Sequence, residues 1–120
     1  MTAEQFIFAA IDRLQSAGLG SLDADQRLVA LISEAGVCCD MDGIDSFVRR
    51  YPTSVVQQCA QAFSEIGAVA IAAALRQVAA EMPNTSEAAL IAANDLITSR
   101  YGYDYDAIVA AVKLRRSGAE

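Results

Sequence analysis

The residues in this sequence with the greatest potential for chemistry are its three cysteines, because the chain contains no histidine. The commonest general base and metal ligand is therefore missing, which excludes Ser-His and Cys-His nucleophile pairs. Cys38 and Cys39 are adjacent, and adjacent thiols chelate zinc poorly, since zinc takes four spaced ligands. Cys59 falls on an apolar helix face, where a thiol packs as a small hydrophobic group. We predict no catalytic residue, no metal and no cofactor; a metal or redox protein is the least favoured alternative.

A second candidate site is the acidic segment that ends the first third of the chain. Residues 40–43 resemble the start of a calcium-binding loop, but the alignment places Cys38 and Arg49 where two carboxylate ligands belong. Calcium binding is therefore not expected. Aspartates at a helix start favour the positive end of the helix dipole, so capping is the simplest role for those near residue 44. The carboxylates that we predict to contact a partner are Asp40, Asp42 and Asp45.

Negative charge is concentrated in the first part of the sequence. Residues 1–48 hold eight acidic residues and two arginines and carry the whole net charge of −6, whereas residues 49–120 hold seven residues of each sign. Such a segment repels nucleic acid, and the cluster of Lys113, Arg115 and Arg116 is too small for a phosphate-binding face. We therefore predict no direct nucleic-acid binding and a basic protein as the partner. A homodimer remains open.

Three tyrosines alternate with other residues near the C-terminal end. Tyr101, Tyr103 and Tyr105 are spaced by two, so they cannot share one helical face, and at least one of them is expected to be exposed. Exposed tyrosine is a frequent anchor of protein interfaces. Tyr103 and Tyr105 are accordingly the predicted anchors if the interface is apolar. That alternative describes an immunity or accessory subunit rather than an electrostatic binder.

The elements that must position these residues are helices, since apolar residues recur every three or four positions and alanine outnumbers β-branched residues. We predict an all-α fold, a compact bundle of six or seven short helices in a single domain of residues 1–120. Residues 37–43 form the least periodic stretch, and the alanine-rich segment 68–82 is expected to be the central helix. The residues that bound the expected helices are Thr2 and Gly18, Asp23 and Gly36, Ile44 and Arg50, Thr53 and Ile66, Ala68 and Met82, Asn84 and Gly102, and Tyr105 and the polar tail from Ser117.

The predicted location is the cytoplasm. The N-terminal residues lack the basic region of a secretory leader, and an odd number of cysteines is typical of a reducing compartment. The longest apolar run, Ile66–Leu75, is far shorter than the ~20 residues that a membrane span requires. No membrane association is therefore expected.

Two segments of the sequence resemble a known bacterial family. The first is the turn and helix start Asp42-Gly43-Ile44-Asp45-Ser46-Phe47, and the second is Ala62-Phe63-Ser64-Glu65-Ile66-Gly67-Ala68 before an alanine-rich helix. Over residues 31–80 the chain is similar to an all-helical domain family of unknown function that includes a DNA-mimic protein. The resemblance implies a helical bundle that binds another protein without catalysis, with acidic residues that imitate DNA phosphates.

Overall fold

Helical periodicity in the sequence is realised as seven α-helices within residues 2–117, the part of the chain that the computed structural model describes. No strand occurs in that range, which confirms the all-α prediction. Residues 118–120 of the expected polar tail lie outside the described residues. The elements are α1 (Ala3–Ala17), the 3₁₀ turn η1 (Leu19–Ser21), α2 (Ala24–Met41), α3 (Ile44–Arg50), α4 (Thr53–Glu65), α5 (Val69–Glu81), α6 (Glu87–Thr98) and α7 (Tyr105–Ser117).

The first two helices begin with reciprocal capping. The side chain of Thr2 accepts a hydrogen bond from the backbone N–H of Gln5 at 3.1 Å, and the Gln5 side chain accepts one from the Thr2 N–H at 2.8 Å. Asp23 and Gln26 repeat this arrangement at the start of α2. Each pair satisfies two backbone donors that the helix itself leaves open. Both starts were predicted from the sequence.

Two helix boundaries differ from the sequence prediction. Helix α2 does not end at Gly36 but continues to Met41, because Cys38 and Cys39 in its last turn are buried. Burial there outweighs the ~1 kcal/mol by which glycine disfavours a helix interior. Helix α6 is capped by Ser86 rather than Asn84, and the Ser86 hydroxyl accepts a hydrogen bond from the N–H of Ala89 at 3.2 Å.

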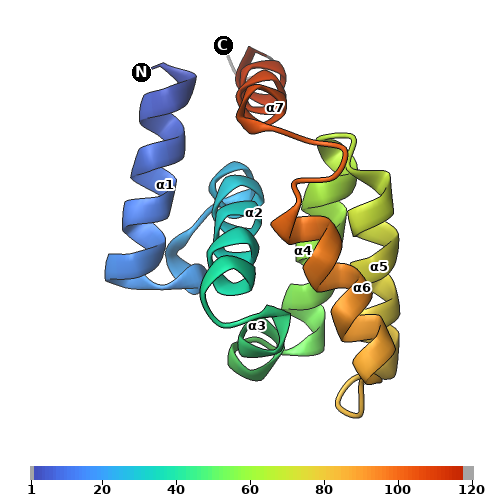
Figure 1. The fold of residues 1–120 in the computed structure, drawn as a ribbon. Coiled ribbons are helices and arrows are strands. Elements are labelled where there is room, and N and C mark those ends of the chain that lie inside the picture. Colours follow the sequence, from blue (N-terminus) through green and yellow to red (C-terminus); the bar gives the residue numbers. More distant parts are fainter. Residues whose placement is uncertain (1, 118–120) are drawn as a thin grey trace.

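The central element is α2, not the alanine-rich α5 that the sequence favoured. Helix α2 packs against α1, α3, α4, α6 and α7, whereas α5 packs mainly between α4 and α6. In Figure 1, α1 lies on one side of α2, and the layer of α4, α5 and α6 lies on the other. Helix α7 lies near the N-terminal end of α1. The continuous apolar run 28–32 lets α2 bury side chains in several directions at once.

The core follows this arrangement. The largest fully buried side chains come from α2 through α7, and they include Phe47, Phe63, Leu75 and Ile97. Of the charged and polar residues described, none is buried. The described helices include none that is long and apolar enough to cross a membrane. The surface must therefore carry whatever the protein recognises.

Candidate functional site

A hollow of about 290 Å³ lies between α3 and α6, and carboxylates surround it. We call it the α3–α6 hollow. Asp45 reaches it from α3, whereas Glu87 and Asp95 reach it from α6, two helical turns apart. Between these two lies Ile91, which is 51% exposed. The lining residues are Gly43, Ile44, Asp45, Glu87, Leu90, Ile91, Asn94 and Asp95.

One hydrogen bond between distant segments assembles this hollow. The side-chain oxygen of Asn94 accepts a hydrogen bond from the backbone N–H of Ile44 at 2.9 Å, which ties the start of α3 to the middle of α6. Gly43 permits the connection, since its φ of +94° lies in a region that L residues with a side chain rarely adopt. The Ser46 hydroxyl donates to the Gly43 carbonyl oxygen at 2.8 Å and closes the turn.

The carboxylates of the hollow differ in their ionic partners. Asp45 forms an exposed ion pair with Arg49, one turn along α3, at 3.1 Å. Glu87 and Asp95 form no ion pair within residues 2–117, and neither does Asp42, which ends α2 just outside the hollow. Sequence reasoning named Asp45 and missed the two α6 carboxylates. Their signal was the spacing of Glu87, Ile91 and Asp95 at i, i+4 and i+8 on an exposed helix face.

Asp40 belongs to a different part of the surface. Its carboxylate oxygens accept hydrogen bonds from Nη1 and Nη2 of Arg100 at 3.2 and 2.7 Å. These hydrogen bonds lower the pKa of the Asp40 carboxyl. Arg100 adopts a left-handed backbone with φ of 56° just after α6, where it also donates to the carbonyl oxygen of Ile97 at 2.8 Å. Asp40 therefore holds the end of α6 against α2, with its charge compensated.

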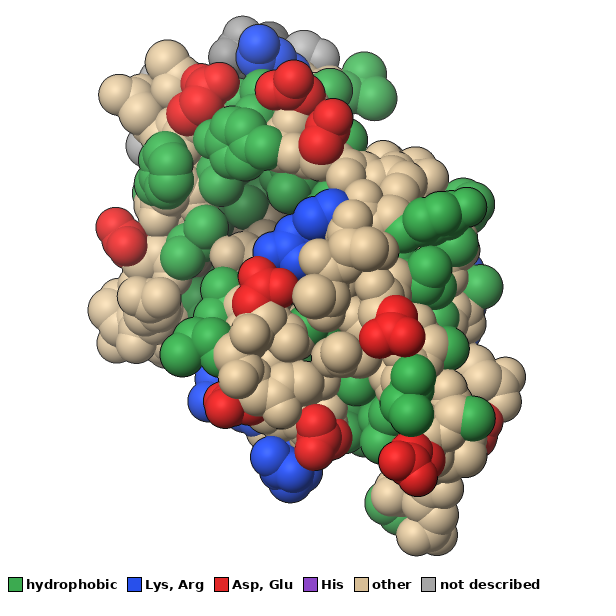
Figure 2. Space-filling view, in the orientation of Figure 1, with side chains coloured by type: hydrophobic (Ala, Val, Ile, Leu, Met, Phe, Trp, Pro, Cys, Tyr) green, Lys and Arg blue, Asp and Glu red, His purple; other side chains and the backbone are tan. Residues whose placement is uncertain are grey.

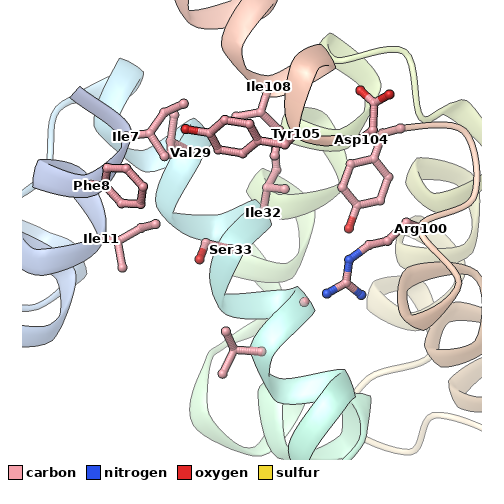
Figure 3. Close-up of a pocket in the computed structure, with 13 residues that line it drawn as sticks. Ile7, Phe8, Ile11, Val29, Ile32, Ser33, Arg100, Asp104, Tyr105 and Ile108 are labelled. Carbon is pink, nitrogen blue, oxygen red and sulfur yellow. The ribbon is translucent and has the colours of Figure 1, made fainter. Parts of the chain in front are cut away.

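The predicted tyrosine anchors line a second depression, which we call the α1–α7 groove. It has a volume of about 390 Å³, with α2 as its floor and α1 and the start of α7 as its walls. Figure 3 shows Phe8 and Ile11 projecting from α1 toward Tyr105 and Ile108 of α7. The lining residues are Ile7, Phe8, Ile11, Val29, Ile32, Ser33, Gly36, Val37, Arg100, Tyr103, Asp104, Tyr105 and Ile108.

The two tyrosines of the groove play different parts. Tyr105 is 45% exposed and presents its ring to the opening. Tyr103 is half-buried and packs edge-on against Phe63, with ring centroids 5.2 Å apart. Burial raises the pKa of Tyr103. Tyr105 is therefore available as an anchor, while Tyr103 joins the groove to the core.

Comparison with protein-family models decides the relationship that the sequence suggested. The model of the DMP19-like protein family matches residues 20–114. The chain belongs to the DMP19-like family. This match contains the whole segment 31–80 on which the resemblance rested, together with the residues that line the α3–α6 hollow and the floor of the α1–α7 groove. Among curated proteins and among solved structures, none matches the chain.

In this DMP19-like chain the two arginines of the C-terminal basic cluster make contacts within the protein. Nε of Arg115 donates to Asp25 at 2.7 Å and Nη1 donates to Glu65 at 2.6 Å, so one guanidinium joins α7 to α2 and α4. The guanidinium of Arg116 lies 4.3 Å from the ring centroid of Phe6 on α1. Both arginines thus hold α7 in place, which leaves little positive charge there for a phosphate backbone.

The cysteines are packed as hydrophobic groups. All three are buried; the thiol of Cys59 contacts the carbonyl oxygen of Leu31, and that of Cys38 contacts the carboxylate of Glu34, each at 3.6 Å. Burial raises the pKa of every thiol, that of Cys39 to about 12, so they stay protonated near neutral pH. Within the described residues, no cluster of potential ligands is arranged to hold a metal ion.

We expect a variant with alanine at positions 38, 39 and 59 to retain the helical circular dichroism spectrum of the wild type. Each substitution removes a small buried group and should cost about 1 kcal/mol. Elemental analysis of the purified wild type should find less than stoichiometric zinc or iron. One equivalent of either metal, together with loss of the helical spectrum in the variant, would show that the thiols bind metal.

Proposed function

We propose that this protein acts without catalysis, by binding a basic protein partner through the α3–α6 hollow, as a DNA-mimic-like regulator. The observation that carries the proposal is the presence of two carboxylates without ion pairs within residues 2–117, Glu87 and Asp95, in the hollow of a DMP19-like chain. Carboxylates that lack a cation within the fold remain available to lysine or arginine of another molecule.

The arrangement of these carboxylates supports recognition of a basic surface. Glu87 and Asp95 lie about 12 Å apart along the α6 axis, given the rise of 1.5 Å per residue. Asp45 stands opposite them on α3. Negative groups on two facing helices are the feature by which this surface would resemble the two phosphate strands of a duplex. Asp40 and Asp45 are less suitable for a test, because each forms an ion pair within the protein. Replacing one of them would leave Arg100 or Arg49 without its carboxylate partner.

Charge alone is too sparse to account for tight binding. A DNA duplex carries one phosphate charge per ~1.7 Å of axis, far more than the hollow provides. Ile91 supplies an exposed apolar contact in the centre of the acidic ring. A combination of a central apolar residue and a charged rim is typical of protein–protein interfaces. We therefore propose a partner that meets both features.

A second candidate function rests on the α1–α7 groove. Its exposed Phe8 and Tyr105 favour an accessory or immunity subunit that binds mainly through apolar contact. Glu87 and Asp95 line the hollow but not the groove. The effect of removing these two carboxylates on association therefore discriminates between the two functions.

The test replaces Glu87 by glutamine and Asp95 by asparagine in one variant. Proteins captured by the wild type from a lysate of the source cells would be identified and purified, and their association rates measured against salt concentration. We expect the double variant to associate about tenfold more slowly at low salt, because steering scales with the charge of the binding surface. Duplex DNA should compete with the wild type for the same partner.

The matched control replaces Asp23 by serine and Asp106 by asparagine. It changes the net charge equally, keeps a capping oxygen at position 23, and lies outside the α3–α6 hollow. We expect its association rate to stay within about twofold of the wild type. Equal slowing by both variants would mean that only net charge matters, and salt-independent association would refute the acidic interface.

A further inference from the structure

The α1–α7 groove concentrates exposed apolar side chains at one place on the surface. Phe8 is 60% exposed, Val37 49% and Tyr105 45%, and all three line the groove although they come from three different helices. In Figure 2, hydrophobic surface opens between α1 and α7 in the upper part of the molecule. Large apolar side chains that converge on one depression mark a binding site more often than the same residues scattered singly.

The floor of the groove is a stripe along α2. Val29, Ser33, Gly36 and Val37 follow each other at helical spacing and extend about 12 Å along the helix axis. The two central residues, Ser33 and Gly36, are small, which lowers the floor between the walls. The guanidinium of Arg100 lies beside Gly36 and closes one end. The floor therefore matches the length of two turns of another helix laid along it.

Carboxylates surround this apolar groove. Glu4 and Asp12 stand four residues before and after Phe8 on α1, and Asp104 lines the opposite wall. None of these three forms an ion pair within residues 2–117, and Figure 2 shows acidic side chains around the exposed hydrophobic surface. The cation that lines the groove, Arg100, is compensated by Asp40. The rim is therefore negative.

We infer that the α1–α7 groove binds an amphipathic helix of a partner protein, with apolar side chains on Phe8, Val37 and Tyr105 and flanking lysines or arginines on the acidic rim. The basic residues of this helix rest on the proposed function, in which the partner is basic. The α3–α6 hollow and the α1–α7 groove would then contact the same partner. The apolar residues at i, i+4 and i+7 of the helix fill the floor, and its basic residues meet Glu4, Asp12 and Asp104.

The negative rim disfavours two other occupants of the groove, a second copy of the chain and a small apolar molecule. A second copy of the chain on a two-fold axis would bring the carboxylates of one groove against those of the same groove in its partner, and like charges oppose that contact. A small apolar molecule would leave the rim without counter-charges. A partner with basic flanks satisfies the apolar floor and the acidic rim together.

The test uses three synthetic helical peptides of about 14 residues, a length at which an isolated helix is marginal and binding must stabilise it. The first has leucines at i, i+4 and i+7 with lysines at both ends, the second has glutamates at the ends, and the third has serines in place of leucines. Dissociation constants come from fluorescence anisotropy. We expect the first peptide to bind at least tenfold more tightly than either of the others.

Amide chemical shifts and two variants locate the peptide. Binding should perturb the amides of α1, of residues 29–37 and of residues 104–108. Replacing Phe8 by serine should weaken binding at least fivefold, because it removes a wall of the groove. Replacing Val69 by serine, on α5 and 68% exposed, removes an exposed apolar residue that does not line the groove and should leave binding unchanged.

Several results would overturn the inference. Equal affinity for lysine-flanked and glutamate-flanked peptides would exclude the acidic rim, and shifts confined to the α3–α6 hollow would exclude the groove. If the amide chemical shifts of groove residues change with protein concentration in the absence of peptide, the occupant is a second copy of the chain. If an apolar dye binds the groove while no peptide does, the occupant is a small molecule. The proposed function fails separately, when the Glu87 and Asp95 variant binds the captured partner like the wild type.

Discussion

Replacing Leu75 by alanine is expected to lower the free energy of unfolding by about 2–5 kcal/mol. Leu75 lies in α5 between α4 and α6, and none of its surface is accessible to solvent. The substitution removes three buried carbon atoms and leaves a space that the surrounding helices fill only in part. The cost depends on how far those helices can close that space. Urea denaturation of the wild type and the variant measures it.

The control for this prediction lies on the same helix. Val69 is 68% exposed, so Val69→Ala should change the free energy of unfolding by no more than about 0.5 kcal/mol. A loss of less than about 0.5 kcal/mol for Leu75→Ala as well would show that this face of α5 is not packed in solution. Parallel urea slopes for the two variants would indicate that only stability has changed.

Local signals in the sequence were sufficient to predict most of the helices. The capping pairs at Thr2 and Asp23 act over three residues, so their geometry can be inferred without knowing the fold. Gly36 misled the prediction because glycine usually weakens a helix. Here the following turn, with Cys38 and Cys39, is buried by neighbours that are distant in the sequence. Tertiary burial of this kind has no local signal.

The distribution of charge shows the same limit. The sequence places the whole negative excess in residues 1–48, yet arginines from residues 49–120 pair with four of these acidic residues, three of them between different segments of the chain and one within α3. The pairs are Asp25 with Arg115, Glu34 with Arg50, Asp40 with Arg100, and Asp45 with Arg49.

In the second half of the chain, Glu87 and Asp95 have no such partner within residues 2–117. The α3–α6 hollow therefore depends on contacts such as the hydrogen bond from Ile44 to Asn94, fifty residues apart. A single sequence holds no signal for a pairing at that distance. For this reason the sequence indicated only some of the carboxylates that line the hollow.

Replacing Gly43 by alanine is expected to lower the free energy of unfolding by about 1–3 kcal/mol. Its φ of +94° and ψ of 163° form a backbone conformation that is nearly restricted to glycine. The added Cβ would also lie 2.9 Å from a carboxylate oxygen of Asp45, so that side chain must move. The variant thus strains the α2–α3 junction and displaces one carboxylate of the hollow.

Gly20→Ala is the matched control, because a Cβ at this position meets no atom within 4 Å and its backbone needs no left-handed conformation. It should be neutral or stabilise the protein by about 0.4–1 kcal/mol. Urea denaturation separates the two variants, and equal stabilities would show that the α2–α3 junction is not held as described.

If Gly43→Ala stays folded and associates with the captured partner more slowly than Gly20→Ala does, the position of Asp45 matters for binding. If the two associate equally fast, the α6 carboxylates Glu87 and Asp95 are sufficient, because they do not depend on the Gly43 turn for their position on the helix.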